Sequence, residues 1–355
     1  MGENRNRPTA RLSGLVREVM RRPVRWGLLE IAFWVAAVLS WFLLPERHLI
    51  LTEIVGLAIF VLSIDLILGF AGIVSLGQAA MYGAGAYASG LLSIHVTGEP
   101  ITGLLVGALA GAVVAFPTSF LLLRGGDLTR LMVTLGVAAV LYELANQTGW
   151  LTGGADGLQG IAIEPLFGRF EFDFYGRTGY AYSLAVLFVL FVLARLITAS
   201  PFGISLKAVR DNPLRASAVG IPVHARQVAV YTLAGAYAGI AGALYTQTQQ
   251  FISLDVLSFQ KSADGLMVLV IGGTGYLYGG LIGAVVYKLI QDGIATLTPQ
   301  YWQFWVGILL VAFVLIGRDR PRQLVGRIAA RLRRPAPKPS TEPASGAVVS
   351  GQQEV

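Results

Sequence analysis

The stretch ILTEIVGLAIFVLSIDLILGF, residues 50–70, is apolar along almost its whole length and carries only two acidic residues. As an α-helix it is long enough to cross a hydrocarbon core of about 30 Å. Charged residues make up 13% of the chain and hydrophobic residues 55%, whereas soluble domains carry about 25% charged residues. Similar apolar tracts lie near residues 27–44, 79–94, 101–123, 131–149, 179–197, 227–246, 262–290 and 300–316. The sequence therefore predicts an all-α polytopic membrane protein.

The tract at 262–290, SADGLMVLVIGGTGYLYGGLIGAVVYKLI, differs from the others because glycines interrupt its middle. Glycine weakens a helix and permits a tight turn or a close helix contact. We predict a glycine-broken late hairpin, formed either by two crossings or by a re-entrant pair. With this hairpin the chain has eight to ten transmembrane helices. The interrupting residues are Gly272, Gly273, Gly275, Gly279 and Gly280.

Basic charge is concentrated at the two ends. Residues 1–26 hold seven Arg against two Glu, and residues 317–355 hold seven Arg and one Lys against three acids. Basic flanks beside membrane spans favour the cytoplasmic side. We therefore predict a cytoplasmic N-terminus at 1–26, a transmembrane region at 27–317, and a cytoplasmic tail at 318–355 that is basic and then disordered.

Two loops inside the membrane region have opposite charge balances. The 198–226 loop has four basic residues against Asp211 alone, so we place it in the cytoplasm. The 147–178 loop is net acidic and rich in turn residues and aromatics, so we place it outside. It could form a docking surface for a soluble binding protein or a lid on the outer mouth.

Several chemistries are excluded by absent residues and motifs. The chain has no Cys, which excludes disulfides and thiolate metal sites. We expect no metal site, no nucleic-acid partner and no cofactor bound by this chain. No nucleotide-binding or hydrolase motif occurs, so the chain is not expected to be an enzyme. If transport is driven by ATP, the ATP binds to separate subunits.

The segment RDNPLRASAVGIP, residues 210–222, shows the signature of a short helix that docks on a partner. Ser200–Pro201 and Asn212–Pro213 each place an N-cap before proline at the first helical position, and Gly220 suits a left-handed stop. The second helix is too short to be stable alone in water. An ordinary positively charged loop would explain the charges but not the two caps.

Polar residues within apolar tracts mark a candidate substrate pathway, because charges there are costly and often functional. Glu53, Asn146 and Asp292 lie near span ends, where we expect solvation at the interface. Asp264 and Lys288 lie in or beside the late tract. Contacts between helices are the alternative role for the pathway residues. The predicted pathway residues are Asp65, Ser75, Gln78 and Glu143.

Four stretches, taken in order, give the sequence a family resemblance. They are GFAGIVSLGQAAMYGAGAYASGLL at 69–92, LTGGADGLQGI at 151–161, SPFGISLKAVRDNPLRASAVGI at 200–221 followed by YTLAGAYAGIAGALY, and MVLVIGGTGYLYGGLIGAVV at 267–286. The chain resembles the branched-chain amino acid ABC transporter permeases of the LivM type. It departs from that pattern at Pro213, where the family commonly has an acidic residue, and at Tyr276 and Tyr278.

The resemblance implies a permease subunit in a bacterial plasma (inner) membrane. Its partners would be two cytoplasmic ABC ATPase subunits, a related second permease and a periplasmic or lipid-anchored substrate-binding protein. The cargo would be branched-chain or related amino acids, with urea or another small polar solute as the alternative. An ion-coupled secondary transporter, using Asp65 or Glu143, is the alternative class.

The resemblance also assigns two sets of site residues. The external motif would dock the binding protein through Gly153, Gly154, Asp156 and Glu164. The cytoplasmic loop would couple to the ATPase through Arg210, Asp211, Asn212, Arg215, Ala216, Ala218 and Gly220.

Overall fold

The computed structural model describes residues 27–123, 125–166, 168–173 and 176–297, together with 300–301, 304–305, 307–308 and 311. The chain divides into two compact units, residues 1–302 and 303–355. Almost all described residues belong to the first unit. The predicted cytoplasmic ends at 1–26 and 318–355, and most of the tract at 300–316, lie outside the described residues.

Within the described residues every regular element is a helix, and extended pairing is limited to isolated bridges. This confirms the all-α prediction. The longer elements are α2 (Leu28–Leu43), α3 (His48–Asp65) with the π-helix η2 (Leu66–Phe70), α4 (Gln78–His95), α5 (Pro100–Leu122), α6 (Asp127–Gln147), α8 (Arg177–Ala199), α11 (Val223–Gln249), α12 (Phe259–Gly272) and α13 (Leu277–Leu297). The shorter ones are α7 (Gly149–Thr152), η3 (Gly154–Asp156), α9 (Pro201–Asp211), α10 (Pro213–Ala218) and η4 (Leu254–Leu257).

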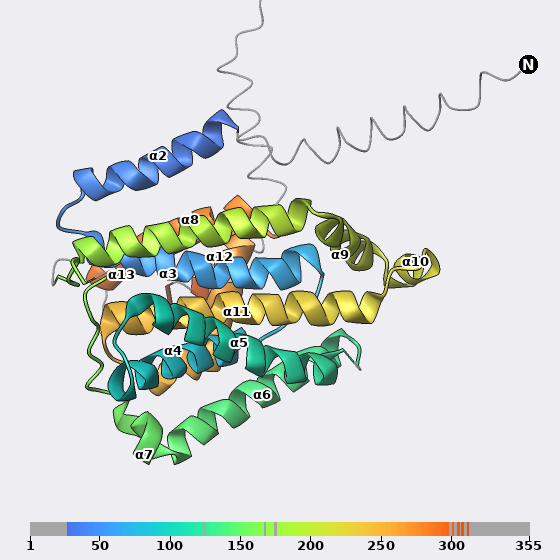
Figure 1. Cartoon of the computed structure of the whole chain (residues 1–355). Coiled ribbons are helices and arrows are strands. Elements are labelled where there is room, and N and C mark those ends of the chain that lie inside the picture. The colour runs from blue at the N-terminus through green and yellow to red at the C-terminus, as the bar shows by residue number, and fades with distance from the viewer. Residues whose placement is uncertain are drawn as a thin grey trace, which may run out of the picture. The chain divides into compact units, whose positions relative to one another are not determined.

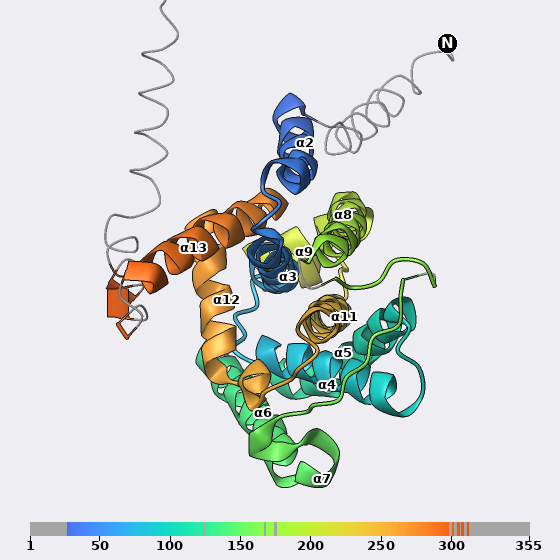
Figure 2. The same ribbon diagram turned by 90° about the vertical axis from the view of Figure 1, so that its left-hand side faces the viewer.

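Helix α11 runs through the middle of the first unit and packs on α3, α4 and α5 (Figures 1 and 2). Glycines allow the close approach of three of these helices. A Cβ atom added to Gly85 of α4 would meet the backbone of Gly239 on α11, and one added to Gly239 would meet the carbonyl of Gly107 on α5. Small residues at such contacts let neighbouring helices pack closely.

In the part of the chain that the structure describes, five helices are long and apolar enough to cross a membrane, or six if α12 and α13 count as one bent span. The predicted count of eight to ten is therefore not confirmed. Helix α2 is short for a span, and α4 is rich in Gly and Ala and mostly buried among other helices. The glycine break is confirmed, because α12 and α13 meet at 111° across residues 273–276.

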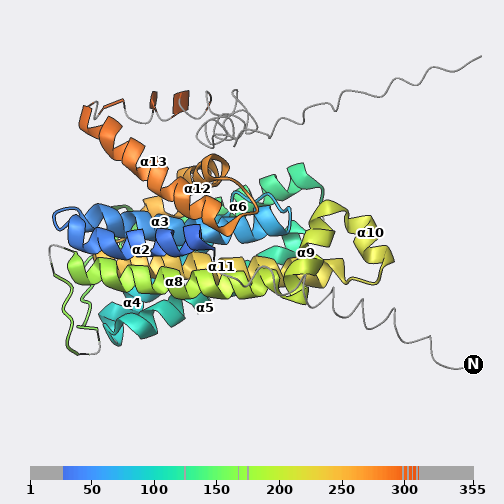
Figure 3. The same cartoon turned by 90° about the horizontal axis from the view of Figure 1, so that it is seen from above.

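The two loops of opposite charge lie at opposite ends of the helix bundle (Figures 1 and 3). Helix α8 leads from the 147–178 loop at one end to α9 and α10 at the other, and α11 returns. This arrangement is what loops on opposite sides of a membrane require. The assignment of each loop to a side stays a prediction.

Candidate functional site

The segment predicted to be cytoplasmic, residues 198–226, contains two capped helices, as the sequence predicts. The side chain of Ser200 accepts a hydrogen bond from the Gly203 amide at the start of α9. The Asn212 Oδ1 atom accepts one from the Arg215 amide at 3.0 Å, which starts α10 directly after α9. Gly220 has a φ of +87°, a left-handed conformation that favours glycine. That this segment docks on a partner stays a prediction.

Helix α10 and its C-cap residue expose two large apolar side chains. Leu214 is 83% exposed and Val219 is 81% exposed. Ala216 is 4% exposed, so among the predicted coupling residues it packs inward, while Ala218 and Gly220 are exposed. A partner that covers α10 would therefore contact the Leu214 and Val219 side, which the sequence alone did not distinguish from the Ala216 side.

Arg210 connects this segment to the interior of the bundle. Its Nη1 atom donates to the carbonyl oxygen of Gly69 at 2.6 Å, and its Nη2 atom lies 3.1 Å from Asp211 Oδ1. Gly69 belongs to η2, where α3 changes from α- to π-helix. The predicted coupling pair Arg210–Asp211 thus lies against a helix interruption, and π-helical turns are often found at functional sites.

Three of the four predicted pathway residues are in the interior near that interruption. Asp65 is fully buried, and its Oδ1 atom accepts a hydrogen bond from the Gly275 amide at 2.7 Å. Ser75 accepts from the Gly77 amide at 3.2 Å. Gln78 is fully buried, and neither polar atom of its amide has a partner among the described residues. An unsatisfied buried amide of this kind calls for a water or a ligand.

Glu143, the fourth predicted pathway residue, does not lie in the interior with the other three. It lies on an exposed part of α6, where its Oε1 atom accepts from Gln147 of the same helix at 2.7 Å. Its contacts are therefore those of a helix-surface residue.

The segment predicted to be external, residues 147–178, is built on glycines and is bonded to the bundle. Gly153 and Gly154 have φ values of +77° and +56°. Asp156 is exposed, whereas Glu164 accepts from the Gly98 amide at 3.3 Å through its side chain. Leu158 pairs with Ile252 through two backbone hydrogen bonds of 2.8 and 3.2 Å, which joins the loop to the chain just after α11.

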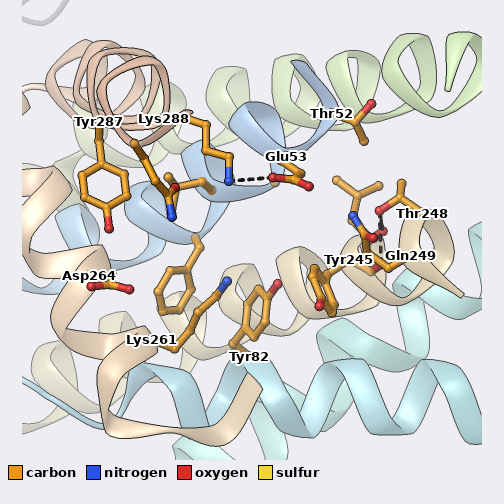
Figure 4. Close-up of a pocket in the computed structure, with 15 residues that line it drawn as sticks. Thr52, Glu53, Tyr82, Tyr245, Thr248, Gln249, Lys261, Asp264, Tyr287 and Lys288 are labelled. Carbon is orange, nitrogen blue, oxygen red and sulfur yellow. Dashed lines mark hydrogen bonds and ion pairs between the residues drawn. The ribbon is translucent and has the colours of Figure 1, made fainter. Parts of the chain in front are cut away.

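A polar cavity of about 280 Å³ lies between α3, α4, α11, α12 and α13 (Figure 4). It is near the bundle end that carries the external segment, since Thr52 in the first turns of α3 and Gln249 at the end of α11 line it. Its lining contains four charged residues from three helices, namely Glu53, Lys261, Asp264 and Lys288. Charges within spans are rare and mark substrate or ion pathways.

Two of these charges form an ion pair. Lys288 Nζ lies 2.6 Å from Glu53 Oε2, so Glu53, whose side chain stays 42% exposed near the end of its span, also has a partner on α13 (Figure 4). Asp264 Oδ1 accepts from Gln260 Nε2 at 3.0 Å. The sequence marked these three residues as polar groups in or beside spans but did not bring them together.

Lys261 was missed because it lies one residue before the apolar tract at 262–290. Its Nζ atom lies 5.1 Å from the ring centre of Tyr82 and 5.6 Å from that of Tyr245. The available signal was the spacing Lys261-x-x-Asp264, which places opposite charges on one helix face. Among the described residues no group of three metal-ligating side chains occurs.

The chain was compared with known proteins. Residues 48–314 match the family described as the permease component of branched-chain amino acid transport systems. The high-affinity branched-chain amino acid transport system permease protein LivM of Escherichia coli is 28% identical over 82% of this chain and 74% of its own length. No solved structure matches.

Relatives with other names are also similar. The L-arabinose ABC transporter permease protein AraH of Azospirillum brasilense is 29% identical over 65% of this chain and 68% of its own. The autoinducer 2 import system permease protein LsrC of Photorhabdus laumondii is 26% identical over 64% of this chain and 66% of its own.

Proposed function

The chain belongs to the family of permease components of branched-chain amino acid transport systems, and from this membership we propose that it is the membrane-spanning subunit of an ATP-driven importer. Its cargo is a branched-chain or related amino acid handed over by a substrate-binding protein. Two cytoplasmic ATPase subunits bind the ATP, and a related permease completes the membrane pair. The complex resides in a bacterial plasma membrane with both termini of this chain in the cytoplasm.

The observation that carries this proposal is the capped pair α9–α10 at one end of the bundle. Two large apolar side chains are exposed there, Leu214 in a helix of six residues and Val219 at the C-cap of that helix. A helix that short is marginal in water without further packing. A groove on an ATPase subunit would cover those side chains, while an ion-coupled secondary transporter would have no use for the pair.

The choice of cargo rests on a second observation. Relatives named for L-arabinose and autoinducer 2 belong to the same range of similarity, so similarity alone does not distinguish a sugar from an amino acid. The cavity beside Glu53 and Lys261 carries charges of both signs. Such a lining favours an amino acid over urea or a neutral sugar, because fixed charges gain most from a charged ligand.

The experiment is ATP-dependent uptake by the complex of this chain with its ATPase, sister permease and binding protein, reconstituted in vesicles. We expect ATP-dependent uptake of leucine, isoleucine or valine, and no uptake of L-arabinose or urea. Uptake driven by an ion gradient without ATP would overturn the importer class. Uptake of only L-arabinose or urea would overturn the cargo.

A variant tests the docking face directly. Leu214→Glu places a charge on the apolar face of α10 and should abolish co-purification of the ATPase, whereas Leu214→Met should retain it. Retained ATPase binding and full uptake by Leu214→Glu would remove the docking assignment.

A further inference from the structure

We propose that the cavity between α3, α4, α11, α12 and α13 binds the zwitterionic head of an α-amino acid. Lys261 binds the carboxylate and Asp264 binds the ammonium group. The inference rests on the proposed function, since it adds to it a binding site and the chemistry by which this chain recognises its cargo.

Lys261 is a cation whose ammonium group makes no ion pair or hydrogen bond with another described residue. It lies over the rings of Tyr82 and Tyr245, both at the cavity wall. Ring faces attract a cation but supply no hydrogen-bond acceptor of carboxylate strength. Lys261 is half-buried, and a charged group withdrawn from water without a hydrogen-bond acceptor is costly. A ligand carboxylate supplies the missing acceptor.

Asp264 supplies the opposite charge three residues further along α12, on the same face of the helix. One of its oxygens accepts from Gln260 Nε2 at 3.0 Å. An ionised carboxylate offers about four acceptor positions, so capacity remains for a ligand ammonium. One helix face thus presents a cation and an anion, which are the two charges that complement the head group of an amino acid.

The other charged pair in the cavity differs because it is already satisfied. Lys288 and Glu53 neutralise each other at 2.6 Å across α13 and α3. They keep this part of the lining polar and join the two helices. Lys261 and Asp264 therefore remain as the pair free to bind a ligand, and Figure 4 shows Lys261 beside Tyr82, below the ion pair.

The remaining lining suits a small apolar side chain. Leu57, Phe60 and Leu244 contribute to the same cavity. The volume of about 280 Å³ lies just below the range of about 300–1,000 Å³ that is usual for pockets holding drug-sized ligands. A molecule of the size of leucine matches this space, with its charged head at α12 and its side chain toward α3 and α11.

The test uses the full complex and three probes. These are leucine, 3-methylbutylamine, which is leucine without its carboxylate, and 4-methylpentanoate, which is leucine without its amine. Each is measured as an inhibitor of labelled leucine uptake. In the wild type, both truncated probes should inhibit at least about tenfold more weakly than leucine, because each forfeits one charge-assisted contact.

Two variants remove one charge each. Lys261→Met should raise the KM for leucine about tenfold or more and erase the advantage of leucine over the amine probe. Asp264→Asn should also raise the KM for leucine about tenfold or more, and it should erase the advantage of leucine over the acid probe. Lys261→Arg, which keeps the charge, should stay within about threefold of the wild type. Asp292→Asn is the matched control, because it removes a charge from α13 outside the cavity lining.

The ratios between probes are measured within one variant, so a general loss of assembled protein does not imitate the effect. Unchanged probe ratios in both Lys261→Met and Asp264→Asn, with a wild type that imports leucine, would overturn the binding site and leave the proposed function intact. A wild type that imports no amino acid at all would overturn the proposed function first.

Discussion

Arg210 of α9 donates a hydrogen bond to the carbonyl oxygen of Gly69 in η2 at 2.6 Å, across 141 positions of the sequence. The Gly275 amide donates to Asp65 one turn away from Gly69, and a Cβ atom added to Gly275 would lie 3.4 Å from Arg210 Nη1. The end of α9, the π-helical end of α3 and the break between α12 and α13 therefore meet at one junction. A movement of α9–α10 would therefore be transmitted directly to the π-helical end of α3 and to the break between α12 and α13. Helix α12 also lines the charged cavity.

Replacing Arg210 should separate ATPase binding from transport. Arg210→Met removes the bond to Gly69 but leaves the exposed face of α10 unchanged, so the ATPase should still co-purify. Uptake should fall about tenfold or more, since hydrogen bonds to charged groups are worth roughly 1.5–3 kcal/mol. Arg210→Lys should be intermediate, because lysine keeps the charge without the planar fork of donors. Full uptake by Arg210→Met would remove the junction from the transport cycle.

The prediction that the 147–178 and 198–226 loops lie on opposite sides of the membrane can be tested by cysteine labelling, because the chain has no native Cys. Asp156 and Ser217 are exposed at the two ends of the bundle. With cells intact, a membrane-impermeant maleimide should modify Asp156→Cys and should reach Ser217→Cys only after permeabilisation. The reverse pattern would invert the predicted topology, and labelling of both from outside would show that the two loops share a side.

Local signals explain which features could be predicted from the sequence. The caps at Ser200 and Asn212 depend on residues within one turn of the helix start, so both helices were predicted. The break at 273–276 follows from glycines that can take positive φ, as Gly273 and Gly275 do. Such features need no knowledge of what lies across the bundle.

Long-range contacts explain the rest. Glu53 and Lys288 form an ion pair only because α3 and α13 pack together. From the sequence, each is therefore predicted only as a polar residue in or beside a span. The inward position of Ala216 depends on how α10 rests on α9. The span count is not confirmed because α4, which is rich in Gly and Ala and buried by its neighbours, is not among the helices that hydropathy marks as spans. Most of the predicted tract at 300–316 also lies outside the described residues.

The glycine contact between α4 and α11 should be essential for folding. Gly85→Ala introduces a Cβ atom against the backbone of Gly239, where neither helix can yield without moving. Overpacking of this kind costs about 1–3 kcal/mol, so the thermal midpoint of the purified protein should fall. Gly136→Ala on α6 is the matched control, because nothing lies within 4 Å of the added atom.

For the control, helix propensity alone predicts a gain of about 1 kcal/mol. Gly136→Ala should therefore be neutral or more stable than the wild type in the same melting experiment. Equal midpoints for Gly85→Ala and Gly136→Ala would show that the contact between α4 and α11 yields without cost.

The external segment offers a last test, which decides between a docking surface and a lid. Asp156 is exposed and lies beside the fixed turns at Gly153 and Gly154. Glu164 is less suitable for this test, since its side chain accepts from the Gly98 amide and its loss would disturb the turn before α5. Charge reversal at Asp156 therefore changes the surface and leaves the loop fold intact.

Asp156→Lys should weaken stimulation of ATP hydrolysis by the binding protein while the basal rate stays normal, and the loss should shrink as salt is raised, because exposed charges mainly affect association and are screened. Asp156→Asn should show about half the effect, since it removes one charge where the lysine changes two. A docking surface thus predicts a graded and salt-dependent series. A lid predicts instead that stimulation is equal in all three proteins, and that result would assign the segment to closure of the outer mouth.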